Sequence, residues 1–212
     1  MKIDEIIKNR GIEEVLHFTT NFGLTGILAT EAILSRKSLP VEKYLEYVYK
    51  YNCQDRSRDT DWHEYINLSI TKVNWRLFSI SMRSWHQDLD GFWCIMAFTP
   101  DILTHPGVFF CTTNNIYTGV SRGQGGENLE RLFADRVIRW TGNVVIRQQD
   151  TPTNQPTCEQ AEVLYPNQLS LDYLKTIYVK TEDDAYSVES LVDTLAKQYK
   201  IDCVVEPALF DA

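Results

Sequence analysis

Short apolar runs alternate with polar or glycine-containing segments along most of this chain. Runs rich in β-branched and aromatic residues predict strands, and mixed apolar and charged stretches with helical spacing predict helices. The predicted strands cover 15–18, 66–70, 76–81, 92–98, 108–112, 143–147, 161–165, 176–179 and 202–205. The predicted helices cover 3–9, 21–30, 40–50, 127–135 and 187–199. Strands that follow one another with few helices between them favour an α+β fold with a mainly antiparallel sheet.

The composition favours one packed domain over residues 1–212. Apolar residues make up 43% of the 212, and no repeat or linker divides the chain. No apolar run is long enough for a transmembrane helix, and the charged start does not resemble a signal peptide, so we expect a cytoplasmic protein that does not contact a membrane. Five scattered cysteines without a Cys-x-x-Cys pair argue against a disulfide scaffold or a zinc site.

Charge is distributed unevenly along the sequence. Residues 1–149 carry 17 basic and 17 acidic side chains, whereas residues 150–212 carry 4 basic and 12 acidic ones, which accounts for the net charge of −8. A basic groove on the neutral part is compatible with nucleic-acid binding, although the overall acidity argues against a large duplex footprint.

One segment combines a carboxylate with an amide after a polar loop. Glu162 opens a predicted strand, and Gln160, two residues earlier, would share its face because strand side chains alternate. The preceding loop, 151–157, is polar and contains prolines, so we expect it to be flexible. A Gln-x-Glu pair after a mobile loop is how many ADP-ribosyltransferases present their catalytic glutamate, but a glutamate at a strand start is more often a solvated edge residue.

Two other polar groups stand at the ends of predicted elements. The strand-to-helix junction at residues 17–21 contains His17, Thr19 and Asn21, whose donors and acceptors suit ribose hydroxyls and a carboxamide, although Thr19, Thr20 or Asn21 could instead cap the following helix. The charged run 55–59 contains Arg56, which could clamp a pyrophosphate or could pair with its acidic neighbours in a solvated loop.

Several remaining motifs carry weaker signals. His63-Glu64 lacks the second histidine of a zinc protease, and Gly119-Val-Ser-Arg-Gly123 lacks the strand that precedes a nucleophile elbow. The glycine-rich stretch 123–126 precedes a helix but has no P-loop lysine, so a surface loop is the simpler interpretation. Trp75 with Arg76 would suit base stacking, although core packing is the commoner role of tryptophan.

The ordered motifs resemble the DarT family of nucleic-acid ADP-ribosyltransferases, toxins of bacterial toxin–antitoxin and phage-defence systems. The resemblance spans roughly residues 15–205. It is carried by these segments in order: His17-Phe-Thr with Asn21, Gly26-Ile-Leu, Asp55-Arg56, Asn67-Leu-Ser-Ile70 with Asn74, the strand around Trp93 followed by Pro100-Asp-Ile-Leu103, Phe110-Cys-Thr-Thr-Asn114, and Pro156-Thr157 with Gln160-Ala-Glu-Val-Leu164.

The resemblance implies an ADP-ribosyltransferase-like split antiparallel β core with flanking helices, and NAD as co-substrate with no metal. It assigns catalysis to Glu162, Gln160 and Arg56, and cofactor binding to His17, Phe18, Thr19, Asn21, Arg56 and Ser69. From their placement alone, Trp75, Arg76, Arg122, Arg147 and Gln148 are predicted to contact the nucleic acid.

The predicted function is transfer of ADP-ribose to a base in single-stranded DNA, by a toxin with a cognate antitoxin protein. The Asn-Leu-Ser-Ile strand is closer to other branches of the family than to the thymidine-modifying branch, so the target base stays open. RNA is the alternative target, because no residue here must read a 2′-hydroxyl. A catalytically silent module that binds nucleic acid or protein is the second alternative.

Overall fold

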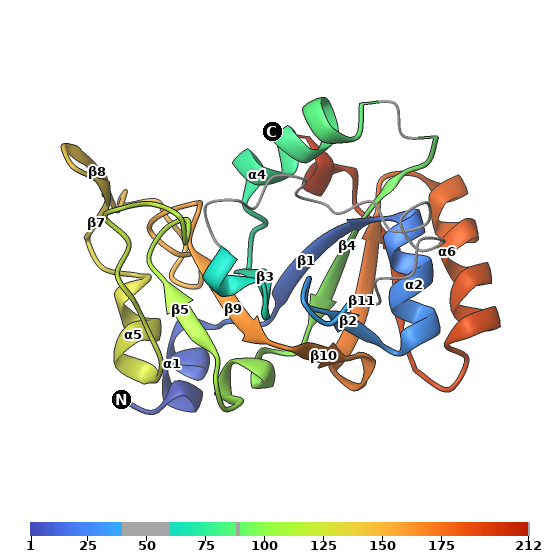
Figure 1. Cartoon of the computed structure of the whole chain (residues 1–212), viewed down its shortest axis with the longest axis horizontal. Coiled ribbons are helices and arrows are strands. Elements are labelled where there is room, and N and C mark those ends of the chain that lie inside the picture. The colour runs from blue at the N-terminus through green and yellow to red at the C-terminus, as the bar shows by residue number, and fades with distance from the viewer. Residues whose placement is uncertain (40–59, 88–89, 212) are drawn as a thin grey trace.

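The computed structural model describes residues 1–39, 60–87 and 90–211, which are built around an eight-stranded sheet (Figure 1). The strand order is β12-β11-β4-β1-β3-β9-β5-β6, and every neighbouring pair is antiparallel except β11 and β12. The strands are β1 (Val15–Thr20), β3 (Tyr65–Ile70), β4 (Trp93–Phe98), β5 (Phe109–Cys111), β6 (Arg122–Gly123), β9 (Glu162–Pro166), β11 (Leu174–Val179) and β12 (Asp202–Val205). The predicted α+β class with a mainly antiparallel sheet is confirmed.

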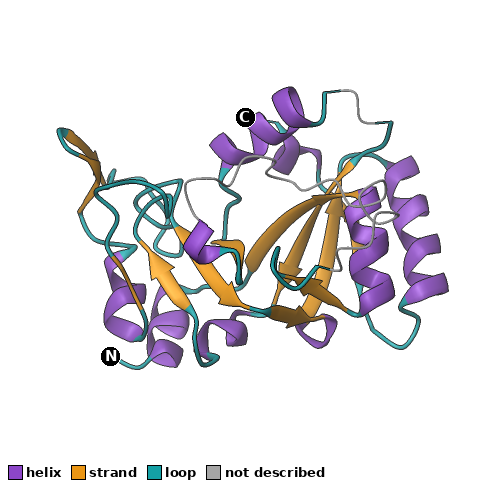
Figure 2. Ribbon diagram, viewed as in Figure 1, coloured by secondary structure: helices purple, strands orange, loops and turns teal. Residues whose placement is uncertain are grey.

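Two small ribbons lie outside this sheet. β2 (Ala32–Leu34) pairs with β10 (Gln168–Ser170), and β7 (Arg136–Trp140) pairs with β8 (Asn143–Ile146). The β7–β8 hairpin projects from one end of the molecule (Figures 1 and 2). Of these four strands the apolar pattern predicted only β8, because β2 and β10 are three residues long and β7 alternates between buried and exposed positions.

The helices cover the sheet and its ends. They are α1 (Ile3–Arg10), α2 (Asn21–Thr30), α4 (Trp75–Ile80), α5 (Gly126–Arg131) and α6 (Glu182–Leu195). α2 and α6 pack side by side at the end of the molecule opposite the β7–β8 hairpin (Figure 2). Among the described residues no helix is both long and apolar enough to cross a bilayer. The helix predicted over 40–50 lies outside the described residues.

The strand predicted over 76–81 is wrong, because this segment is helix α4, continued by a π-helical turn at Ser81–Trp85. Trp75, Phe78 and Met82 follow a three- and four-residue spacing that sets all three against the same apolar cluster, as on one face of a helix. Asn74 caps the helix, because its side-chain oxygen accepts a hydrogen bond from the Leu77 N–H at 3.1 Å.

The sheet is split between β1 and β3. β1 pairs with β4 along all six residues, from Val15↔Phe98 to Thr20↔Trp93. On its other side only Val15↔Ile70 and Leu16↔Ser69 are paired with β3. Beyond Leu16 the two strands therefore no longer form a ladder, and we call this separation the seam. It is the feature that the predicted split core requires.

Candidate active site

Glu162 is the first residue of β9 and is buried, with 3% of its surface exposed. Its Oε2 accepts a hydrogen bond from the Asn115 N–H at 2.7 Å, and its Oε1 lies 3.4 Å from the Asn114 side-chain Nδ2. A buried carboxylate is tolerated only when hydrogen bonds or charges compensate for its lost hydration. The commoner reading of such a glutamate, a solvated strand-edge residue, is therefore wrong for Glu162.

The register places Glu162 near the seam. β3 and β9 pair through Leu68↔Val163, and continuing this register by one residue sets Ser69 opposite Glu162. Ser69 is also paired with Leu16 of β1, at the point where the β1–β3 pairing ends. β1, which carries His17, borders the seam on one side and β3 borders it on the other, so the carboxylate lies on the strand next to β3, one strand away from the seam.

Gln160 does not share a strand face with Glu162, because it lies in a turn before β9 begins. Strand alternation therefore does not apply to this pair, and the prediction of a common face is wrong. Gln160 is nevertheless buried, with 2% exposed. Its side-chain oxygen has no hydrogen-bond partner among the described residues, so it is an available acceptor inside the protein.

The loop that leads to Glu162 is fastened by Arg147. Its guanidinium donates hydrogen bonds to the carbonyl oxygens of Pro152 (2.7 Å) and Gln155 (2.9 Å) and to the Thr157 hydroxyl (3.2 Å). Neighbouring Gln148 is exposed and bonds the Ile146 carbonyl. In this structure Arg147 organises the loop, whereas its predicted contact with nucleic acid stays untested.

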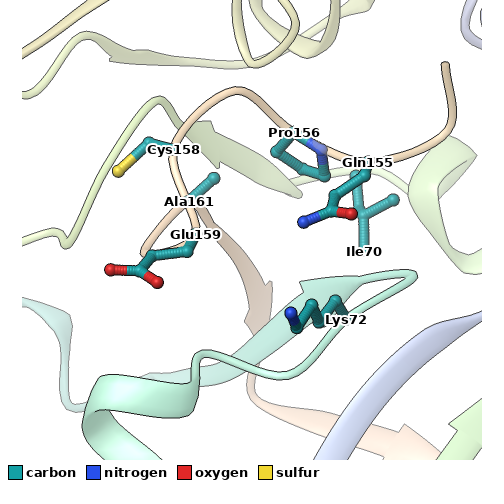
Figure 3. Close-up of a pocket in the computed structure, with 7 residues that line it drawn as sticks. All are labelled: Ile70, Lys72, Gln155, Pro156, Cys158, Glu159 and Ala161. Atoms are coloured by element: carbon teal, nitrogen blue, oxygen red, sulfur yellow. The ribbon is translucent and has the colours of Figure 1, made fainter. Parts of the chain in front are cut away.

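The same loop rests on the segment that follows α1 and on the turn after β3. The Asn154 side chain donates to the Gly11 carbonyl, and the Asn154 carbonyl accepts from the Thr71 hydroxyl at 2.9 Å. A small pocket lies between the turn and the loop, lined by Ile70, Lys72, Gln155, Pro156, Cys158, Glu159 and Ala161 (Figure 3). The backbone path into Glu162 is thus supported from both sides.

His17 bridges the seam with its side chain. Its Nδ1 lies 3.1 Å from the carbonyl oxygen of Asn67 on β3. A carbonyl only accepts, so Nδ1 carries the proton, and Nε2 of the neutral ring is left as an acceptor. Burial lowers the pKa of His17 to about 4, against a smaller opposing effect of the Asn67 carbonyl, so the ring is neutral at physiological pH.

At the junction after β1, the first turn of α2 lies close to the Thr19 side chain. Thr20 caps α2, because its hydroxyl accepts from the Gly23 N–H at 3.2 Å. A Cβ at position 23 would lie 2.2 Å from the Thr19 hydroxyl oxygen, so glycine allows the helix to begin directly on Thr19. The Asn21 main-chain N–H donates to the Phe92 carbonyl at 2.9 Å, and the Asn21 side-chain oxygen accepts from the Phe92 N–H at 3.3 Å. The predicted capping role therefore falls to Thr20.

Two other predicted cofactor residues have structural partners. Phe18 packs against Phe78 and Trp93 at ring-centroid distances of 4.8 and 5.9 Å, on the opposite face of β1 from His17 and Thr19. The Ser69 hydroxyl accepts from the Asn74 N–H at 3.2 Å. Phe18 is therefore part of the aromatic packing under the site.

The residues predicted to contact nucleic acid lie on separate elements, with Trp75 and Arg76 on α4 and Arg122 on β6. Trp75 packs edge-on against Phe78 at 5.6 Å, and Arg76 is exposed on the same helix. Arg122 lies on β6, two strands from Glu162 in the sheet order. Arg56, the predicted phosphate clamp, lies outside the described residues.

Sequence reasoning missed the groups that hold the two central side chains. Asn114 and Asn115 were assigned no role, although they contact Glu162, and Asn67 was assigned none, although its carbonyl orients His17. The contacts of Asn115 and Asn67 use main-chain atoms, which leave no signal in residue types. The Asn115 side-chain Nδ2 is buried without a partner among the described residues, so the site also offers a donor.

The comparisons with known proteins agree with this geometry. A family profile described as "ssDNA thymidine ADP-ribosyltransferase, DarT" matches residues 16–210. The chain belongs to the DarT family. No curated protein matches the sequence. The family match confirms that the chain is an ADP-ribosyltransferase that uses NAD⁺ and acts on single-stranded DNA.

Solved DarT structures share the fold at low identity. Thermus sp. 2.9 DarT in complex with ADP-ribosylated ssDNA gives a TM-score of 0.70 at 11% identity, covering 94% of this chain and 96% of that one. The same protein in complex with NAD⁺ gives 0.66 at 12%, covering 93% and 96%. Thermosipho africanus DarTG in complex with ADP-ribose gives 0.56 at 16%, covering 93% of this chain and 51% of that one. The predicted ADP-ribosyltransferase-like class is thereby confirmed.

The described residues contain no cluster of three or more histidine, cysteine, aspartate or glutamate side chains suited to a metal ion. The polar groups beside Glu162 are instead amides and main-chain N–H groups. Such donors and acceptors suit the hydroxyls and carboxamide of NAD⁺.

Proposed function

We propose that this DarT family member transfers ADP-ribose from NAD⁺ to a thymidine base in single-stranded DNA and acts as a toxin. The observation that carries the proposal is the buried Glu162, fixed by the Asn115 N–H at the edge of a split sheet. A carboxylate kept away from water and held at a defined place is suited to a developing positive charge.

Glu162 is the proposed catalytic residue. Cleavage of the N-glycosidic bond between nicotinamide and ribose leaves a sugar with oxocarbenium character, which a nearby carboxylate stabilises. The base nitrogen then forms the new bond to the same sugar carbon, its proton passes to Glu162, and nicotinamide leaves as a neutral molecule. Nicotinamide is a good leaving group, so the protein contributes mainly position and exclusion of water.

The residues of β1 are proposed to hold the nicotinamide half of NAD⁺. The neutral His17 ring offers Nε2 as an acceptor for a ribose hydroxyl or the carboxamide N–H. Thr19 on β1, Ser69 on β3 and Asn21 at the start of α2 add short polar side chains near the seam. Arg56 is proposed to contact the phosphates, and Gln160 to assist Glu162 through its unpaired side-chain oxygen.

The toxin role implies a cognate antitoxin. The name DarTG describes the Thermosipho africanus protein, whose structure contains ADP-ribose. By analogy, a partner protein of this chain would either remove the mark or cover the site. We propose that the chain acts in the cytoplasm, where NAD⁺ and single-stranded DNA are both present.

Labelled NAD⁺ and a set of matched oligonucleotides test this function. The set contains one single-stranded DNA rich in thymidine, versions in which each thymidine is replaced by another base, the RNA equivalent, and the duplex. We expect label on the thymidine-containing strand and little on the duplex, because bases in single strands need no flipping energy. The Glu162→Ala variant should label nothing while its circular dichroism stays that of the wild type.

Two results would overturn parts of the proposal. Label on RNA alone would move the target to RNA, and label that follows another base would remove thymidine. Absence of both label and released nicotinamide from every reaction would leave the silent binding module as the better description.

A further inference from the structure

The segment that holds Glu162 is not part of any strand or helix. Asn114 and Asn115 lie between β5 and β6, where the chain turns. The Asn115 N–H donates a hydrogen bond to the carboxylate at 2.7 Å. A donor on a connecting segment can drift unless something fixes that segment. The position of Glu162 therefore depends on what holds residue 115.

Arg122 fixes residue 115 through its main-chain carbonyl. Its Nη2 donates a hydrogen bond to the Asn115 carbonyl oxygen at 2.7 Å. The start of the same segment is tied to the residue before Arg122, because the Thr112 N–H donates to the Ser121 carbonyl at 3.0 Å. The N–H of residue 115 thus faces Glu162 while its carbonyl is held by a cation.

The sheet register explains why Arg122 is in reach. Cys111 on β5 is paired with Glu162 on β9 and with Arg122 on β6. Residues that stand opposite each other in neighbouring strands share a face of the sheet, so the two charged residues flank Cys111 at a Cα separation of roughly 10 Å. Burial and then Glu162 raise the pKa of the Cys111 thiol to about 12, and Arg122 opposes them, so both charges act on this position.

An aromatic ring covers the guanidinium. The Arg122 Cζ lies 4.9 Å from the centroid of the Trp62 ring. Trp62 is in turn packed against Phe109 at 5.3 Å and Tyr65 at 5.1 Å. A planar cation stacked on a ring that is itself fixed loses little further freedom when it donates a hydrogen bond.

From these contacts we infer that Arg122 is a positioning residue, stacked on Trp62, which sets the Asn114–Asn115 segment so that it holds the Glu162 carboxylate. This inference rests on the proposed catalytic role of Glu162. Arg122 acts through the Asn115 backbone and does not touch the reacting atoms.

A competing role for Arg122 is a direct phosphate contact, because the residue is exposed and carries a positive charge. The two roles differ in what they change. A phosphate contact governs affinity for DNA and its salt dependence, and its loss reduces the salt slope by about 1. A positioning residue governs kcat, with substrate affinity preserved.

The test compares Arg122→Gln, Arg122→Lys and Trp62→Leu with the wild type in single-turnover transfer, with affinity for single-stranded DNA measured at several salt concentrations. Arg136→Gln, which removes the same charge from an exposed position on β7, is the matched control. We expect Arg122→Gln to lower kcat roughly 10- to 100-fold, the range for loss of a hydrogen bond to a charged group. Affinity for DNA and the salt slope should match those of Arg136→Gln.

The other variants keep the inference testable if Arg122→Gln folds poorly. Arg122→Lys retains a charge and a donor but not the planar stack, so its kcat should fall between those of the wild type and Arg122→Gln. Trp62→Leu should lower kcat by a smaller factor. Unchanged kcat in Arg122→Lys and Trp62→Leu, or a loss confined to DNA affinity with a reduced salt slope, would overturn the inference. A wild-type protein without transfer activity would instead contradict the proposed function.

Discussion

The two halves of the sheet meet at the seam and are built differently. On the side of β12, β11, β4 and β1, each neighbouring pair of strands is paired over at least four residues, with one register shift between β11 and β4, and β1 pairs with β4 along its full length. On the other side, β5 and β6 are only three and two residues long. Buried polar residues lie there at the start of β9, just before it, and between β5 and β6: Glu162, Gln160, Thr112, Thr113 and Asn115. The comparison teaches that the two halves contribute different groups to the proposed site, with His17 and Thr19 on β1 and Glu162 on β9.

The largest expected effect comes from Glu162→Gln, which keeps the size of the side chain but removes its charge. We expect transfer to fall by at least about 1,000-fold, because the developing positive charge loses its stabilising partner. Thermal unfolding should change little, since an amide still accepts from the Asn115 N–H. Transfer within tenfold of the wild type would contradict the catalytic role.

Phe78→Ala should do the opposite, with a large effect on stability and little on chemistry. Phe78 is fully buried among Phe18, Trp75, Trp93 and Phe210. Truncating such a side chain costs about 3–5 kcal/mol of unfolding free energy. Urea unfolding measures this loss, and activity per folded molecule at low temperature should stay near that of the wild type. A drop in activity without loss of stability would mean that stability and catalysis do not depend on separate parts of the molecule.

The pH dependence of stability should reveal His17. Its pKa is about 4 in the folded protein and 6.5 in the unfolded chain. Between these values the unfolded chain binds a proton that the folded protein does not, so stability falls as pH falls from 6.5 through 4, by at most about 3 kcal/mol. Unfolding of the wild type and of His17→Gln across this range measures the effect. Parallel curves for the two proteins would contradict it.

Removal of the His17 ring should affect catalysis less than the loss of Glu162. His17→Ala deletes the acceptor at the seam and the bond to the Asn67 carbonyl. We expect kcat/KM for NAD⁺ to fall roughly 100-fold, equivalent to about 2.7 kcal/mol. His105→Ala is the matched control, because His105 bonds the Tyr165 hydroxyl elsewhere in the fold. Equal losses in the two variants would argue against a specific role for His17.

The smallest expected effect belongs to Asn114. Its side chain lies 3.4 Å from Glu162, a long hydrogen bond that supplements the main-chain donor of Asn115. Asn114→Ala should therefore lower kcat only about 3- to 10-fold. A loss as large as that of Glu162→Gln would mean that the side chain, and not the backbone, holds the carboxylate.

Much of the fold was readable from the apolar pattern, including β1, α2, β4 and β12. The pattern fails at 76–81, where it predicts a strand although apolar residues at three- and four-residue spacing form helix α4, and at three-residue strands such as β2. In the site, residue types pointed to Glu162 and His17. The support given by the Asn67 carbonyl and the Asn115 N–H was invisible, because every residue has these atoms and only the fold decides where they lie.

We expect His17 on β1 and Glu162 on β9, which lie on opposite sides of the seam, to contact the same bound NAD⁺. A crystal structure of this protein with carba-NAD⁺, whose bond to nicotinamide resists cleavage, tests it most directly. The account predicts that His17 Nε2 lies within hydrogen-bond distance of the nicotinamide ribose or its carboxamide, with the Glu162 carboxylate facing the same sugar. A ligand that contacts only one of the two residues, or neither, would contradict the account.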